Sequence, residues 1–255
     1  MIKEQSQELK EQGYTIIRNQ ISSIWLELLS KGVDKTFIQY QQYPNNQEGV
    51  ALHAILGDSI FFQFLQVLLD DGFVESLKIN FFKSPCILNS FSALNNIPNQ
   101  PNFSSKPHRD LRFYSGDFNM MLNCLIMVDD FTVDNGGTFI LPNSHKIEDY
   151  HGDDYFFKNC KQITGNKGDI LIFNANTFHA SAPNNTKGDR RAIPFTLSRS
   201  CMKQLLDYPR AIGYERMNEF PEELQQLLGY HSRVPASLDE WYQPEENRFY
   251  KKSQD

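Results

Sequence analysis

The segment KGDILIFNANTFH, residues 167–179, contains the pattern around which the rest of the chain is organised. It opens with a Lys-Gly-Asp turn, continues into an apolar run that ends at Phe173, and reaches a second turn at residues 174–176. A short apolar run between two turns is typical of a strand buried on both faces. His179 follows the second turn. The pattern therefore places an imidazole directly after a core strand.

Similar short apolar runs fill the middle of the chain, and Asn, Gly, Pro and Asp separate them. Runs of this kind, bounded by turn residues, predict β-strands. One such turn is expected at residues 135–137, which read Asn-Gly-Gly. The chain should therefore be mainly β, as a sandwich or barrel, with strands predicted at 79–82, 87–91, 120–128, 138–141, 169–173 and 192–197.

Helical patterns lie at both ends of the chain. Residues 3–12 predict a helix that Gly13 ends, before a strand-like run at 14–17, and apolar spacing of three and four returns at 24–29 and 60–69. At 255 residues, one domain is the expected organisation. We expect that domain to span residues 1–255 and to comprise a helical N-terminal layer at 1–78, a β core at about 79–200 and a C-terminal helical appendix at 203–255.

Composition excludes several classes of function. The net charge is −6 and the basic residues are scattered, which argues against an obligatory nucleic-acid partner. No apolar run approaches the length of a membrane span, and the polar start resembles neither a signal peptide nor an anchor. The four cysteines form no CxxC pair and are expected to be reduced thiols in a cytoplasmic protein. The oligomeric state is left open.

The tripeptide His108-Arg109-Asp110 is the second chemical pattern. In an extended segment, residues two apart point to the same face, so an imidazole and a carboxylate would lie side by side. His179 could supply a third ligand. Two histidines and one carboxylate on one side of a metal leave three positions open, as in the facial triad of non-haem iron(II) oxygenases. The predicted metal ligands, which are also the predicted catalytic residues, are His108, Asp110 and His179.

The same residues imitate another motif, because His108-Arg109-Asp110-Leu111 also begins a protein-kinase catalytic loop. That loop needs an asparagine five residues after its aspartate, where this chain has Ser115. No glycine-rich phosphate loop lies upstream. A kinase is therefore excluded.

Arg190 lies eleven residues after His179, at the start of an apolar run. A guanidinium near a metal is suited to hold the far carboxylate of 2-oxoglutarate through two parallel hydrogen bonds. Arg191 alternates with Arg190 and should face the other side of the strand. Arg109 should likewise point away from the metal if its segment is extended, but it could still reach the mouth of the substrate pocket.

Four spaced blocks resemble the phytanoyl-CoA dioxygenase family. They are PHRDL (107–111), DNGGTFILPNSHK (134–146), KGDILIF (167–173) and FHASAPNNTKGDRRAI (178–193). The similarity covers about residues 10–200. It implies a double-stranded β-helix (a jelly roll, cupin-like), Fe(II) as the metal, and 2-oxoglutarate and O2 as co-substrates.

The resemblance also implies roles for single residues. Ser181 matches a serine that joins the arginine on the oxo-acid carboxylate, and Asn123 is a further candidate for that task. His145 matches a turn histidine and is expected to be structural. Asp110 is retained where halogenating relatives have a small residue, which favours hydroxylation.

The expected reaction is hydroxylation of an unactivated C–H bond in a small organic metabolite, with release of succinate and CO2. The long polar segments 95–107 and 143–166 are candidates for the walls and lid of its pocket. His53 and His231 have no partner at metal spacing, so ordinary structural roles are expected. Two alternatives stay open: a non-catalytic metal-binding jelly-roll module, and a metal-dependent hydrolase or isomerase of cupin type. The sequence does not identify the substrate.

Overall fold

The centre of the protein is an antiparallel 7-stranded sheet, seen in a computed structural model that describes residues 3–100, 104–252 and 254. Its strand order is β1-β8-β5-β10-β4-β2, and β3 pairs with β10 on the same edge as β4. The strands are β1 (Tyr14–Ile17), β2 (Val50–Ala51), β3 (Cys86–Phe91), β4 (Ala93–Asn96), β5 (Met121–Met127), β8 (Ile170–Asn174) and β10 (Arg190–Arg199).

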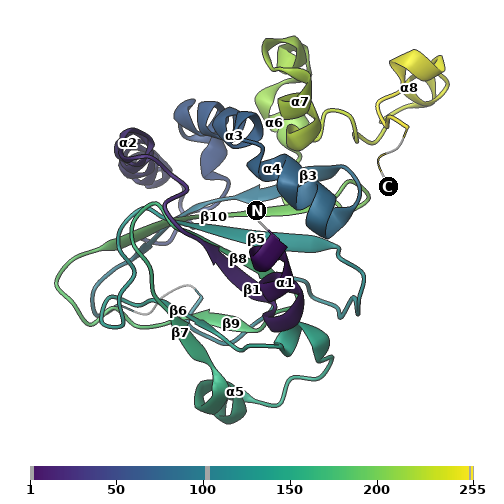
Figure 1. The fold of residues 1–255 in the computed structure, drawn as a ribbon. Coiled ribbons are helices and arrows are strands. Elements are labelled where there is room, and N and C mark those ends of the chain that lie inside the picture. The colour runs from purple at the N-terminus through teal and green to yellow at the C-terminus, as the bar shows by residue number, and fades with distance from the viewer. Residues whose placement is uncertain (1–2, 101–103, 253, 255) are drawn as a thin grey trace.

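A second, 3-stranded sheet has the order β7-β6-β9 and lies on the opposite side of the large sheet from most of the helices (Figure 1). Its strands are β6 (Thr138–Ile140), β7 (Lys161–Ile163) and β9 (His179–Ser181). Two facing antiparallel sheets with flanking helices confirm the predicted jelly-roll fold.

Helices cover one face of the large sheet (Figure 1). They are α2 (Ser23–Tyr40), α3 (Ile60–Asp70), α4 (Phe73–Leu77), α6 (Tyr208–Ile212) and α7 (Glu222–Leu228), while α1 (Lys3–Gln12) lies beside β1, α5 (Asp153–Asn159) lies near the small sheet and α8 (Leu238–Trp241) projects from the body. Within the ranges described above, no helix is both long and apolar enough to cross a membrane.

The central strand β5 explains how the two layers are held together. All seven of its residues, MLNCLIM, are buried, because helices cover one face of the strand and the small sheet covers the other. Leu122, Cys124 and Ile126 pack in the main core beneath the helices. Leu125 and Met127 pack in a second core on the other face. The single polar residue of this strand is Asn123.

Pro194 occupies an unusual place in the middle of β10. A proline has no N–H to donate to a sheet and is normally confined to strand edges or interruptions. Here β10 pairs with β4 up to Ala192 and with β3 from Phe195, so Pro194 lies where one partner strand replaces the other. Its carbonyl accepts a hydrogen bond from the backbone N–H of Ser92, which connects the two partners.

The structure corrects the prediction of a strand at 79–82. Residues Lys78–Phe82 form a turn of π-helix that continues α4, and the N–H of Lys83 donates to the carbonyl of Lys78. Phe81 and Phe82 are both buried, which an alternating strand with one solvent face does not allow. Tertiary packing therefore overrides the β preference of these side chains.

Two other boundaries differ from the prediction. The expected helical layer contributes two strands to the large sheet: β1, which was predicted at 14–17, and β2, which was not predicted. The expected loop at 143–166 contains α5 and β7, because Phe156 is fully buried and holds the helix against the small sheet. Residues 101–103 of the other expected loop lie outside the described residues.

Candidate functional site

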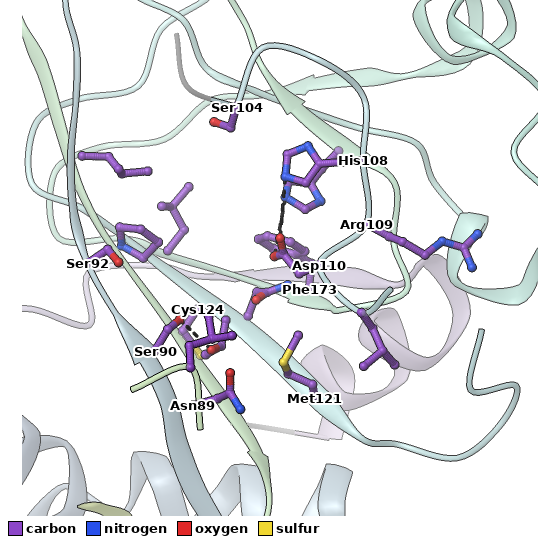
Figure 2. A pocket seen from close by; sticks show the side chains of 18 of the residues that line it. Asn89, Ser90, Ser92, Ser104, His108, Arg109, Asp110, Met121, Cys124 and Phe173 are labelled. Atoms are coloured by element: carbon purple, nitrogen blue, oxygen red, sulfur yellow. Dashed lines mark hydrogen bonds and ion pairs between the residues drawn. The ribbon is translucent and has the colours of Figure 1, made fainter. Parts of the chain in front are cut away.

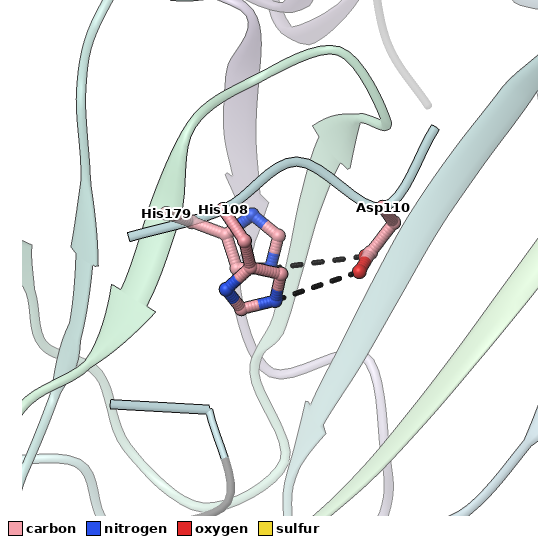
Figure 3. Close-up of side chains that lie close together, drawn as sticks. All are labelled: His108, Asp110 and His179. Atoms are coloured by element: carbon pink, nitrogen blue, oxygen red, sulfur yellow. Dashed lines mark ion pairs between the residues drawn. The ribbon is translucent and has the colours of Figure 1, made fainter. Parts of the chain in front are cut away.

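Three side chains converge on one point between the sheets (Figure 3). One ligand atom from each of His108, Asp110 and His179 lies within 4.8 Å of the other two. The Nε2 atom of His108 is 3.6 Å from Asp110 Oδ1, and the Nε2 atom of His179 is 3.7 Å from Asp110 Oδ2. These distances exceed a hydrogen bond but suit two ligands that are each about 2 Å from a shared ion. The residues present therefore fit a divalent metal of the iron type.

Backbone pairing brings the ligands together. His179 begins β9, and the segment containing His108 pairs with it as an isolated bridge. The two residues exchange hydrogen bonds of 3.0 and 2.9 Å between their N–H and carbonyl groups. Asp110 follows two positions later in the same extended segment. Strand pairing thus closes a gap of about seventy residues in sequence and brings His179 to the pair His108 and Asp110.

Each imidazole is oriented through its second nitrogen. His108 Nδ1 lies 2.8 Å from the carbonyl of Lys106, and His179 Nδ1 lies 3.0 Å from the carbonyl of Thr177. A carbonyl only accepts, so Nδ1 carries the proton and Nε2 keeps its lone pair for a metal. Burial also lowers the pKa of His179, which favours the neutral, metal-binding form.

A cavity of about 690 Å³ opens beside these ligands (Figure 2). Its walls come from both sheets, because β5 and β10 line it on one side and β9 on the other. The predicted site residues Asn123, Ser181 and Arg190 all line this same cavity. A cavity of this volume fits a small organic molecule.

Arg190 is the main charged group of the wall. Its side chain is only 4% exposed, and its guanidinium lies 4.1 Å above the ring of Phe131. Nη2 donates to the carbonyl of Gly136 at 3.0 Å, whereas Nε has no hydrogen-bond partner among the described residues. Burial lowers the pKa of Arg190 to about 10, so it remains a cation at neutral pH. A buried cation with open donors is suited to an anionic ligand.

Asn123 presents a similar unpaired group. It is 3% exposed, and neither atom of its side-chain amide has a hydrogen-bond partner in the part of the chain that is described. Because a buried amide without a partner is costly, an amide left open towards a cavity indicates a ligand position. Ser181 is partly satisfied, since its hydroxyl lies 2.8 Å from that of Ser104.

Gly136 lies in the Asn-Gly-Gly turn, and its backbone contacts Arg190 at the site. Its φ of +90° belongs to the left-handed region, and an added Cβ would collide with Asn96 and the carbonyl of Ala182. Only glycine fits there, and its carbonyl receives the hydrogen bond from Arg190. The turn joins β5 and β6 as predicted and also positions the arginine.

The neighbouring arginines point away from the cavity centre. The side chain of Arg109 points away from His108 and Asp110 (Figure 2). It donates to the carbonyls of Ile147 and Glu148 and stacks on the ring of Phe178. Arg191 pairs with Asp129 and Asp34 beneath the helices. Both orientations confirm the alternation predicted for extended backbone.

The structure also places His145 and the described residues of the two long polar segments, 95–107 and 143–166. His145 Nε2 contacts the carbonyl of Lys10, at 3.1 Å, which fits the expected structural role. The 95–107 segment supplies Asn96 and Ser104 to the cavity lining, whereas the 143–166 segment supplies no residue to it among those described. Sequence reasoning missed a polar wall on β3 and after β2, formed by His53, Asn89, Ser90 and Ser92. Polar residues inside the apolar run CILNSF were the available signal.

Known proteins share both the sequence pattern and the fold. Residues 9–192 match the family described as phytanoyl-CoA dioxygenase (PhyH). The uncharacterised protein Rv1501 of Mycobacterium tuberculosis is 32% identical over 201 residues, which are 77% of this chain and 72% of that protein. The carbocyclase SnoK from nogalamycin biosynthesis, described as non-haem and α-ketoglutarate-dependent, superposes with a TM-score of 0.63 at 17% identity, over 78% of this chain and 84% of its own. The epimerase SnoN, solved with Fe3+, α-ketoglutarate and nogalamycin RO, gives 0.57 at 16% identity, over 76% and 82%. The chain belongs to the phytanoyl-CoA dioxygenase family.

Proposed function

We propose that this dioxygenase binds Fe(II) through His108, Asp110 and His179 and hydroxylates a C–H bond of a small organic molecule. Family membership supports the class of iron- and 2-oxoglutarate-dependent enzyme. The observation that carries the proposal is Arg190, a buried cation with an open donor in the same cavity as the three metal-ligand side chains. A non-catalytic module and a cupin-type hydrolase have no need of such an oxo-acid clamp.

The residues divide the work between two ends of 2-oxoglutarate. Arg190 would hold the far carboxylate, with the hydroxyl of Ser181 and the amide of Asn123 as additional partners. When bound, the iron provides the centre at which 2-oxoglutarate and O2 react, with release of succinate and CO2. The protein fixes the imidazole orientations, and the ring of Phe173, 4.6 Å from that of His179, limits access of water to the ligand.

Asp110 supports hydroxylation as the outcome. A carboxylate ligand occupies the position that halogenating relatives leave open for a halide, so no such position is provided here. Ring closure and epimerisation are named for SnoK and SnoN. For this chain, gain of one oxygen atom by the substrate would separate hydroxylation from either of those reactions.

The proposal is tested by measuring succinate release from purified protein with Fe(II), 2-oxoglutarate and O2 over a panel of small metabolites. We expect one chemical class to stimulate succinate formation in step with an oxygenated product, identified by mass spectrometry. Metal binding without succinate from any compound would instead support a metal-binding module. Turnover that continues without O2 would support a hydrolase or isomerase.

A further inference from the structure

The cavity has a second polar end, which lies apart from the residues proposed to hold iron and 2-oxoglutarate. Figure 2 shows Ser90, Ser92 and Asn89 lying apart from His108 and Asp110 along the cavity. Ala51 of β2 pairs with Ala93, which brings the segment after β2, including His53, to this end of the large sheet. The wall around it is mostly apolar, with Leu52, Leu94, Met202 and Leu205, and it also contains Lys203.

His53 is held in an uncommon backbone conformation at this wall. Its φ of 58° and ψ of 37° are left-handed, a region that residues other than glycine rarely occupy. The hydroxyl of Tyr40 donates to its carbonyl at 2.9 Å and fixes the strained peptide. Strain of this kind persists only where the surroundings enforce it, and it concentrates at functional sites.

The proton on the His53 ring can be assigned from its partner. His53 Nδ1 lies 3.0 Å from the hydroxyl of Tyr208, which is fully buried. If Nδ1–H donated to this hydroxyl, the buried tyrosine proton would have no acceptor among the described residues. Tyr208 therefore donates to Nδ1, and in the neutral ring the proton lies on Nε2.

Burial lowers the pKa of His53, so the neutral ring is the form present at physiological pH. No hydrogen bond to Nε2 is present among the described residues, and the residue lines the cavity. The hydrogen bond from Tyr208 thus fixes the Nε2–H of His53 as a donor at this end of the cavity. A donor of this kind selects a ligand with an oxygen acceptor, because a ligand without one would leave the N–H unpaired.

We propose that His53 is a substrate-positioning residue whose Nε2–H donates a hydrogen bond to a carbonyl oxygen of a largely apolar substrate. The inference rests on the proposed function only in treating this cavity as the substrate pocket. His53 would fix one end of the substrate and leave the remainder extending towards His108 and Asp110. This role is distinct from metal or oxo-acid binding.

The tautomer is tested directly by 15N NMR of histidine-labelled full-length protein. We expect His53 to show a protonated Nε2 and an unprotonated Nδ1 in the wild type. Tyr208→Phe removes the proton donor to Nδ1, and the single tautomer should then give way to a mixture. A wild-type ring protonated on Nδ1 would overturn the proposal. Because this measurement needs neither iron nor turnover, it is independent of the proposed function.

Recognition is tested with two compounds of nearly the same shape, acetophenone and α-methylstyrene, in which a C=CH2 group replaces the carbonyl. Calorimetry is done on the full chain loaded with Zn2+ and 2-oxoglutarate. We expect the wild type to bind acetophenone about threefold to tenfold more tightly, as for one neutral hydrogen bond. In His53→Asn the preference should disappear.

His53→Asn is the informative variant, because asparagine tolerates the left-handed backbone and its amide oxygen can still accept from Tyr208. It lacks an atom at the Nε2 position. The exposed His151→Asn serves as the control and should keep the preference. Equal affinity of the wild type for the two compounds, no binding of either, or a preference that survives in His53→Asn would each overturn the proposal.

Discussion

Two adjacent arginines lie on opposite faces of β10 and have opposite surroundings. Arg190 faces the cavity with one hydrogen bond to a carbonyl and an open Nε, and burial lowers its pKa. Arg191 faces the helices, where it bonds to Asp129, Asp34 and Ser30. Hydrogen bonds and nearby carboxylates raise its pKa. The same residue type therefore serves two different purposes one position apart.

The two faces of β10 differ in whether the protein itself supplies the hydrogen-bond partners of a buried polar side chain. On the helix face, the guanidinium of Arg191 is paired with carboxylates of the protein, and these partners stabilise the fold. On the cavity face, the side chains of Arg190 and Asn123 are buried but have polar atoms without a hydrogen-bond partner among the described residues. Buried polar groups without partners are uncommon in folded proteins, and at the wall of a cavity they indicate a position for a ligand. The predictions that follow disturb one face at a time.

The largest effect should come from removing a metal ligand on the cavity face. His179→Ala is expected to weaken Fe(II) binding by more than about a hundredfold, because loss of a residue that only orients a ligand already costs about tenfold to a hundredfold. Succinate formation should be lost with it. Iron binding is measured by anaerobic titration. The exposed His151→Ala is the control, and wild-type iron affinity in His179→Ala would remove it from the ligand set.

Next in size is the effect of exchanging the two arginines separately for methionine. Arg190→Met should raise the 2-oxoglutarate concentration needed for half-saturation about a hundredfold, since ionic hydrogen bonds to the oxo-acid are lost. Arg191→Met should leave that concentration nearly unchanged and lower the free energy of unfolding by about 1–3 kcal/mol. Oxo-acid titration and urea unfolding measure the two quantities. Identical behaviour of the two variants would contradict the distinction between the faces.

A smaller effect, with an unusual sign, is expected at Asn123. Asn123→Leu removes a buried amide without partners, so the protein free of 2-oxoglutarate should gain about 1–2 kcal/mol of stability. Its affinity for 2-oxoglutarate should fall about tenfold. Asn89→Leu is the matched control in the same cavity, because the Asn89 amide donates to the carbonyl of Lys203 and its loss should destabilise the protein. Destabilisation by both variants would show that the Asn123 amide has a structural partner.

Much of the fold could be predicted because local patterns and tertiary structure agree. The runs at 87–91, 120–128 and 169–173 are apolar, bounded by turns and buried, so β3, β5 and β8 lie where they were expected. The run at 79–82 failed because its phenylalanines have the same β preference but pack as a helical turn. Short strands such as β2 contain too few residues to show a period of two.

The candidate site was predictable where chemistry depends on spacing along an extended chain. His108 and Asp110 lie two positions apart, and strand pairing to His179 completes the cluster. His53 could not be found in this way, because its environment depends on Tyr208, which lies 155 positions later in the chain. Contacts this distant carry no local pattern. That the Asn123 amide has no hydrogen-bond partner among the described residues can also be recognised only when its neighbours in the fold are known.

The smallest predicted effect is on the free energy of unfolding at acid pH, and it depends on the helix face of β10. Burial alone would raise the pKa of Asp129, but hydrogen bonds from the side chain and backbone of Arg191 outweigh it and lower the pKa below the ordinary 3.8. A carboxyl with a lowered folded pKa contributes stability above its unfolded pKa and loses it as pH falls through the folded value. Urea unfolding measures the difference in free energy of unfolding between the wild type and Arg191→Met. This difference should be constant from about pH 5 to 8 and should become smaller below about pH 4. Narrowing that begins above pH 5 would assign the acid dependence to histidines instead. Arg190→Met should show much less of this narrowing, because no carboxylate within the described residues hydrogen-bonds to Arg190.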